Sequence, residues 1–129
     1  MTTEHQKPRG GVAADVSRHI VQLLHEYTGR GPTKARTYIH DDLIVCLVRD
    51  TLTNAERRLV AGGEREIVLA ARRASQRTME RDCVAAVEEL TGRKVIAFVS
   101  ENHIDPDLAL ESFVLEPLAG PAASVGRQS

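Results

Sequence analysis

The amino-acid sequence predicts an α+β domain, a two-layer sandwich in which helices cover one face of a four-stranded sheet. Residues 13–28 and 64–91 have apolar side chains at helical spacing. Residues 34–48 and 94–116 each contain two short segments with the composition of β-strands. The order is therefore helix, hairpin, helix pair, hairpin, and a helical crossover must join the second strand to the third.

The N-terminal half is expected to form a helix and a β-hairpin. The helix over residues 13–28 ends where Gly29 permits a left-handed cap. Residues 34–40 alternate between apolar and polar side chains, which predicts a half-exposed strand. Residues 41–42, both Asp, form the turn into a strand over residues 43–48 that is apolar on both faces.

The helix pair that follows has clear boundary signals. Thr53 and Glu56 have the spacing of a capping box, which predicts a short helix ending at Val60. A long helix is expected over residues 64–91, closed by Gly92. The residues predicted to face the sheet from this helix are Val68, Ala71, Met79, Cys83, Ala86, Val87 and Leu90.

The second hairpin is expected to contain a long loop. Residues 94–99 form an apolar third strand, and residues 112–116 form the fourth strand. The polar residues 100–108 between them are predicted to be a loop.

Composition indicates one folded body with two tails. The chain has 129 residues, 42% apolar and 27% charged, as is typical of a single globular domain. Residues 1–12 and 118–129 are expected to be disordered tails, with the folded domain spanning residues 13–117. Cys46 and Cys83 have apolar neighbours and are expected to be reduced core residues.

Several function classes are disfavoured. A formal net charge of −1 and an aromatic content of 3% are unlike those of a nucleic-acid-binding domain. The longest apolar run, residues 43–48, is far shorter than the roughly 20 residues of a membrane-spanning helix. The first residues contain no apolar stretch of the signal-peptide type, so a cytoplasmic location is expected, with no direct membrane insertion.

Strands that are apolar on both faces indicate a partner. If the helices cover one face of the sheet, the apolar residues of 43–48 and 94–99 on the other face are left exposed, which is unfavourable. We expect a homodimer that covers this face. The alternative is that the first helix covers it.

The first candidate site combines two loops. Arg30 and Lys34 lie in a Gly-rich basic segment, where backbone amides and cations could bind an anion. The P-loop pattern is absent, and a helix cap with solvated charges would also account for the segment. The chain direction places this segment at the same end of the sheet as the loop around His103.

That second loop contributes Asn102, His103, Asp105 and Asp107 to the same candidate anion-binding or partner-binding site. Turn chemistry explains much of this composition. An N/O metal site and proton transfer by His103 remain as alternatives. An internal salt-bridge network between the two loops is a further one.

A second candidate site lies on the long helix. Arg73, Arg77 and Arg81 are spaced four apart and form an arginine ridge with no acidic residue four positions away. The ridge is either a solvated helix face or a docking surface for an acidic partner.

Several segments resemble a known family. These segments are residues 27–35, 41–46, 90–100, 102–107 and 113–116. They are similar to the MpsC-like bacterial family, formerly catalogued as a domain of unknown function, over about residues 14–117. The resemblance implies a small domain associated with a membrane ion or inorganic-carbon transport system. It supplies no catalytic residues.

The expected function is a cytoplasmic, dimeric accessory or regulatory module that binds another protein, such as a membrane transporter subunit, at the inner membrane face. A small-anion sensor is the first alternative. A metal-dependent or acid–base enzyme using His103 is the second, although no nucleophile motif is present and no cofactor is expected.

Overall fold

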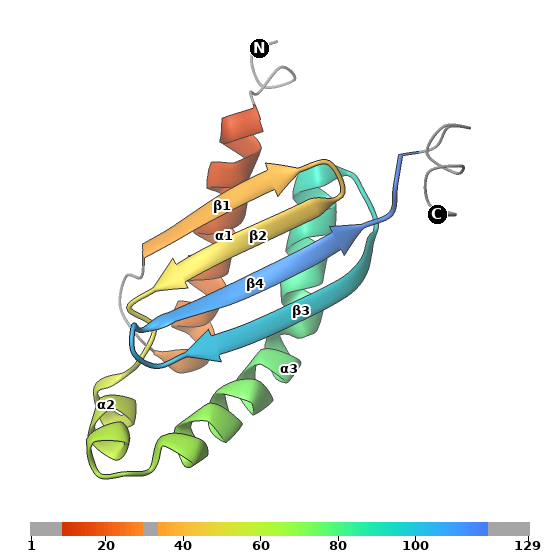
Figure 1. Ribbon diagram of the computed structural model, residues 1–129. Helices are drawn as coiled ribbons and strands as arrows, with labels where there is room; N and C mark the ends of the chain where they lie inside the picture. Colours follow the sequence, from red (N-terminus) through yellow and green to blue (C-terminus); the bar gives the residue numbers. More distant parts are fainter. Residues whose placement is uncertain (1–8, 30–33, 119–129) are drawn as a thin grey trace.

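A computed structural model describes residues 9–29 and 34–118 (Figure 1). In this part of the chain the elements are α1 (Arg9–Thr28), β1 (Lys34–His40), β2 (Leu43–Arg49), α2 (Asn54–Ala61), α3 (Arg65–Thr91), β3 (Val95–His103) and β4 (Leu108–Leu115). The strands form one four-stranded antiparallel sheet, and α1 and α3 pack against each other on one of its faces. The predicted α+β class is confirmed. The alternative in which the first helix covers the opposite face is wrong.

The strand order is β1-β2-β4-β3. Strands β2 and β3 are joined by α2 and α3, as the predicted helical crossover requires, and β4 lies between them. The β1–β2 turn at residues 41–42 and the β3–β4 turn at residues 104–107 lie at opposite ends of the sheet. Because α1 and α3 cover one face of the sheet, each strand presents alternate side chains to these helices. The remaining side chains lie on the uncovered face, which we call the open face.

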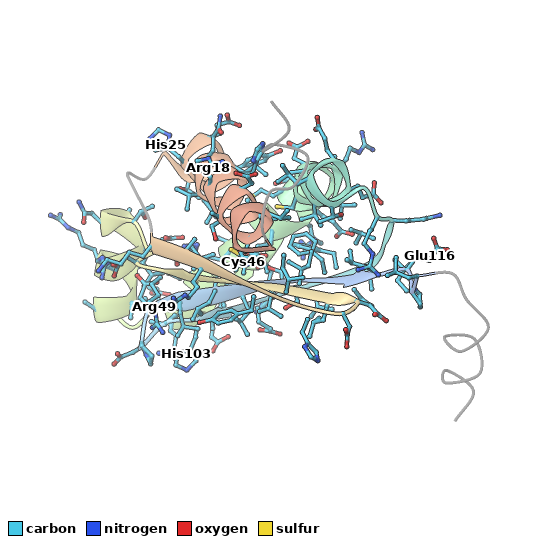
Figure 2. All side chains as sticks on the ribbon, turned by 90° about the horizontal axis from the view of Figure 1, so that it is seen from above. Arg18, His25, Cys46, Arg49, His103 and Glu116 are labelled. Carbon is cyan, nitrogen blue, oxygen red and sulfur yellow. The ribbon has the colours of Figure 1, made fainter. Side chains whose placement is uncertain are left out.

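A mainly aliphatic core, with Phe113 as its largest side chain, fills the space between the sheet and the two helices. Its fully buried members are Val16, Ile20, Ile44, Cys46, Val48, Met79, Cys83, Val87, Phe113 and Leu115. Cys46 lies between β2 and α1 (Figure 2), and both cysteines are buried and free, as predicted. Burial raises the pKa of the Cys46 thiol to about 11 and that of Cys83 to about 12, so both remain protonated near neutral pH.

Three predicted boundaries move by four residues each. Helix α1 begins at Arg9 rather than at residue 13, because Val12 also packs against the core and extends the apolar period backwards. Residues 100–103, predicted to be loop, continue β3 and pair with β4, which begins at Leu108. An irregular register between Val95 and Ala97 exposes Ile96 and turns Val95 and Phe98 towards the helices.

Helix ends follow the predicted signals. The hydroxyl of Thr53 accepts a hydrogen bond from the Glu56 backbone N–H at 3.1 Å, and the Glu56 carboxylate accepts one from the Thr53 N–H at 2.8 Å. This is the capping box expected from the sequence. Gly92 closes α3 with a φ of 69°, a left-handed conformation that side chains with a Cβ atom disfavour.

We expect Gly92→Ala to lower the free energy of unfolding by about 1 kcal/mol, because alanine is strained in the left-handed conformation. Gly62→Ala is the matched control. Its φ is −88°, and an added Cβ would meet the Arg58 carbonyl oxygen at an ordinary 3.5 Å. Its effect should stay within about 0.5 kcal/mol. Urea unfolding of both variants checks this, and equal losses would contradict the assigned role of Gly92.

Candidate functional site

The inner face of α3 is polar between the buried side chains of Val68 and Met79. Arg72 and Gln76 are buried in series with the apolar residues of the helix, whereas Ala71, predicted to face the sheet, is exposed. The prediction for this turn was wrong because hydrophobicity alone decided it. Hydrogen-bond partners on the sheet and on the β2–α2 connection make burial of the two polar side chains favourable.

Glu111 is the centre of this polar region. It lies on β4, is 1% exposed, and accepts hydrogen bonds from the Ser100 hydroxyl at 2.6 Å and the Gln76 amide at 3.2 Å. Gln76 and Asn102 exchange two side-chain hydrogen bonds, at 2.7 and 3.2 Å. Burial raises the pKa of Glu111, while the hydrogen bonds from Ser100 and Gln76 and the charge of Arg72 oppose that rise.

Sequence reasoning missed Glu111, although a signal was present. Strand period two places it in phase with Ala109, Phe113 and Leu115, all of them buried. An acidic residue in phase with a buried apolar series indicates a buried carboxylate that requires hydrogen-bond partners.

Arg72 links the helix to the connection between β2 and α2. Its guanidinium donates a hydrogen bond to the Thr51 carbonyl oxygen at 2.7 Å, and its Nε lies 3.6 Å from the Glu56 carboxylate. Because Glu56 also belongs to the capping box, one carboxylate joins the start of α2 to the buried arginine.

Asp107 fixes the second hairpin turn to the same connection. One carboxylate oxygen accepts hydrogen bonds from the Thr51 backbone N–H at 3.0 Å and the Thr51 hydroxyl at 2.9 Å. The other accepts the Leu52 N–H at 3.0 Å and the Arg57 guanidinium at 3.3 Å. The carboxylate therefore organises the local structure through four protein donors.

The residues of the first candidate site do not converge on one point. Arg30 lies outside the described residues. Asn102 points into the helix layer, where it pairs with Gln76. His103 lies on the opposite side of the sheet (Figure 2), and its Nδ1 is 2.9 Å from the Pro106 carbonyl oxygen.

Lys34 does share an end of the open face with His103, as the chain direction predicts. The register places Lys34 beside Arg49, Arg49 beside Leu108, and Leu108 beside His103. Two strands therefore separate the lysine from the histidine.

The loop around His103, as the structure describes it, does not have the arrangement of a metal site. Asp105 is exposed in the turn, whereas the Asp107 carboxylate is engaged as described above. Within residues 9–29 and 34–118, no group of three or more His, Cys, Asp and Glu side chains has an arrangement that could hold a metal ion.

The arginine ridge is exposed, as a docking surface requires. Arg73, Arg77 and Arg81 lie on the outer surface of α3, and none of them forms an ion pair with any other described residue. Guanidinium groups bind carboxylates through paired N–H donors.

Two hollows lie along the ridge. The first, of about 210 Å³, lies between α3 and β3. It is lined by Arg73, Gln76, Arg77, Glu80, Phe98 and Ser100. The second, of about 530 Å³, lies where α1 and α3 meet and is lined by Tyr27, Arg77, Thr78, Glu80, Arg81 and Asp82. The polar network that contains Gln76 and Ser100 thus forms the floor of the first hollow.

Comparison with known proteins gives a family and a relative. The model of the family described as "Na+-translocating membrane potential-generating system (MpsC)" matches residues 8–117. An uncharacterized protein of Bacillus subtilis (strain 168), YbcI, is 28% identical over 96 residues, covering 72% of this chain and 76% of the relative. No solved structure matches the chain. Among the described residues, no helix is both long and apolar enough to cross a membrane.

We predict that Glu111→Gln stabilises the fold at neutral pH. The folded-state pKa of Glu111 is raised, so the folded state retains a proton that the unfolded state releases, and stability falls as the pH rises above the ordinary value of 4.5. Each unit by which the pKa is raised corresponds to about 1.4 kcal/mol. The neutral amide recovers this free energy because its nitrogen can donate to the Ser100 hydroxyl, which also accepts, while its oxygen still accepts from Gln76.

Urea unfolding between about pH 4 and pH 8 measures the difference between this variant and the wild type. The difference should be smallest at acid pH and grow as the pH rises. Glu89→Gln, an exposed carboxyl on α3, is the control and should show no such growth. A difference that does not change with pH would contradict a buried, proton-retaining Glu111.

Asp107→Asn should lower the free energy of unfolding by about 1–3 kcal/mol, because the amide replaces one acceptor oxygen with a donor facing N–H groups. Asp105→Asn removes the same charge from an exposed position in the same turn and should change stability by less than about 0.5 kcal/mol. Chemical unfolding of the pair checks this. Similar losses in both variants would show that Asp107 does not fix the turn.

Proposed function

Because the chain belongs to the MpsC family, we propose that it is an accessory module that binds a protein of a Na+-translocating membrane system from the cytoplasmic side. The observation that supports this proposal most is the arginine ridge of α3, whose guanidinium groups are exposed, unpaired within the described residues and placed beside two hollows. The surface fits an acidic segment of the partner.

The charge of the ridge is local. The whole chain has a formal net charge of −1, so a partner is attracted to the ridge and not to the protein at large. Glu80 is the acidic side chain that lines both hollows. Arg73 and Arg81 lie at the two ends of the ridge, where their guanidinium groups can bind an acidic partner. An acidic segment lying along α3 would pair with these ends first.

The buried network gives the ridge a fixed base. Gln76 is held by Glu111 and Asn102, and Arg72 is held by Thr51 and Glu56. These contacts hold the half of α3 that precedes Met79, where Arg73 and Arg77 lie. A preorganised surface loses less side-chain and backbone freedom when a partner binds.

The magnitude expected of the ridge is modest. Each exposed ion pair contributes roughly 0.2–1 kcal/mol, so three arginines account for about 1–3 kcal/mol of binding. Such pairs are screened by salt and affect association rate as well as affinity. Apolar contacts inside the hollows, such as those available from Phe98 and Tyr27, would supply further binding energy.

The test is co-sedimentation of the purified protein with washed membranes from cells that make such a Na+-translocating system and from cells that lack it. We expect binding only to the first membranes. Reversal of all three ridge charges, in R73E/R77E/R81E, should weaken this binding at least about tenfold. The wild-type binding should also fall as salt is added.

The matched control is R58E/R65E/K94E, which changes the net charge equally at exposed positions outside the ridge. It should bind as the wild type does. Equal binding, or no binding, to the two kinds of membrane would remove the transport link. Equal losses in the two triple variants would show that net charge acts and that the ridge is not the docking surface.

A further inference from the structure

The open face of the sheet has the composition of an interface. Its centre is apolar, and several of its side chains are strongly exposed, including Tyr38 at 53%, Val99 at 56% and Leu43 at 43%. The apolar residues on this face are Tyr38, Leu43, Val45, Leu47, Ala97, Val99, Leu108, Leu110 and Val114. An apolar patch that crosses four strands is unfavourable in water.

We infer that a second copy of this chain covers the open face, about a two-fold axis parallel to the strands, with Arg36 of each copy paired with Glu101 of the other. This inference is independent of the proposed function, because the arginine ridge lies on α3 in the opposite layer of the molecule (Figure 1).

The strand register arranges the open face in four rows. The rows run across β1, β2, β4 and β3, and they are Lys34–Arg49–Leu108–His103, Arg36–Leu47–Leu110–Glu101, Tyr38–Val45–Ser112–Val99 and His40–Leu43–Val114–Ala97. Arg36 and Glu101 therefore lie at the two ends of one row. They face solvent from opposite edges of the sheet, and neither has an ion pair within the described part of the chain.

The charges are divided between the two edges. Lys34 and Arg36 lie on β1 and Arg49 on the neighbouring strand, where they line a hollow of about 210 Å³. Glu101 on β3 is the acidic residue of the open face. A partner surface that complements this face therefore needs an acidic group over β1 and a basic group over β3.

A second copy satisfies this requirement in one orientation. Rotation about an axis parallel to the strands places β1 of one copy over β3 of the other. Each row of one copy then faces the same row of the other copy. Arg36 then faces Glu101 twice, Tyr38 faces Val99, and Leu47 faces Leu110. Aligned packing of two sheets about 10 Å apart, with strands within about 30° of each other, has this geometry.

The other face-to-face orientation is disfavoured by charge. Rotation about an axis perpendicular to the strands places β1 over β1, so Lys34 and Arg36 of both copies gather at one edge. Glu101 of both copies would gather at the other. Like charges brought together in this way are destabilising, whereas the strand-parallel axis forms two complementary pairs.

The size of the face predicts a reversible dimer. Four strands about 4.8 Å apart, with seven to nine residues at about 3.3 Å each, present an area of roughly 20 by 25 Å. This is at the small end of specific interfaces. We therefore expect the monomer and dimer to exchange at micromolar concentrations, a range that ultracentrifugation measures directly.

The experiment is sedimentation equilibrium of the full chain over micromolar to near-millimolar concentrations. The wild type should approach twice the monomer mass. Arg36→Glu and Glu101→Arg each place like charges together twice, so each should raise the dissociation constant at least about tenfold. The double variant R36E/E101R restores two opposite pairs and should return the dissociation constant to within a few-fold of the wild type.

Arg65→Glu and Glu89→Arg make the same charge changes on α3, away from the open face, and should leave the dimer intact. Circular dichroism confirms that each variant is folded. A monomeric wild type throughout the range overturns the inference. So does a folded double variant that is as weak as the single ones.

The competing occupant is a dissolved anion held by Lys34, Arg36 and Arg49. That occupant predicts binding of inorganic phosphate by calorimetry and no effect of Glu101→Arg on mass. Either the absence of a Glu101→Arg effect or a phosphate-binding monomer overturns the dimer.

Discussion

The structure depends on one constraint: both long helices lie on the same face of a single sheet. Helices α1 and α3 pack side by side, so every strand has one covered and one uncovered set of side chains (Figure 2). The covered sets form the mainly aliphatic core, against which Val95 and Phe98 of β3 also pack. The uncovered sets form the apolar open face, and its exposure is the feature that a second copy relieves.

Between the main core and a smaller apolar cluster of Leu52, Val68 and Ile104, the covered layer is polar, and this polar region organises the surface of the molecule. Glu111, Gln76 and Asn102 hydrogen-bond across the sheet–helix interface, while Asp107 and Arg72 hold the β2–α2 connection. A buried carboxylate weakens the fold when ionised, yet its partners fix the half of α3 that carries most of the arginine ridge. The two proposed surfaces thus lie on opposite layers of one framework.

The sequence predicts those features that depend on neighbouring residues. The span of β1 follows from the alternation of its side chains, and the capping box at Thr53 and the cap at Gly92 follow from contacts within a few positions. Burial of Arg72, Gln76 and Glu111 depends on partners 11 to 35 positions away, which periodicity does not encode. For the same reason residues 100–103 resemble a loop, although pairing with β4 makes them a strand.

The contact between the two sheets tests the central claim most directly. In a mixture of isotope-labelled and unlabelled protein at a concentration where the dimer forms, filtered nuclear Overhauser spectra report contacts between copies alone. The account predicts contacts from the Val99 methyl groups of one copy to the Tyr38 ring of the other. Contacts between copies that involve α1 or α3 instead, or none from the open face, would contradict it.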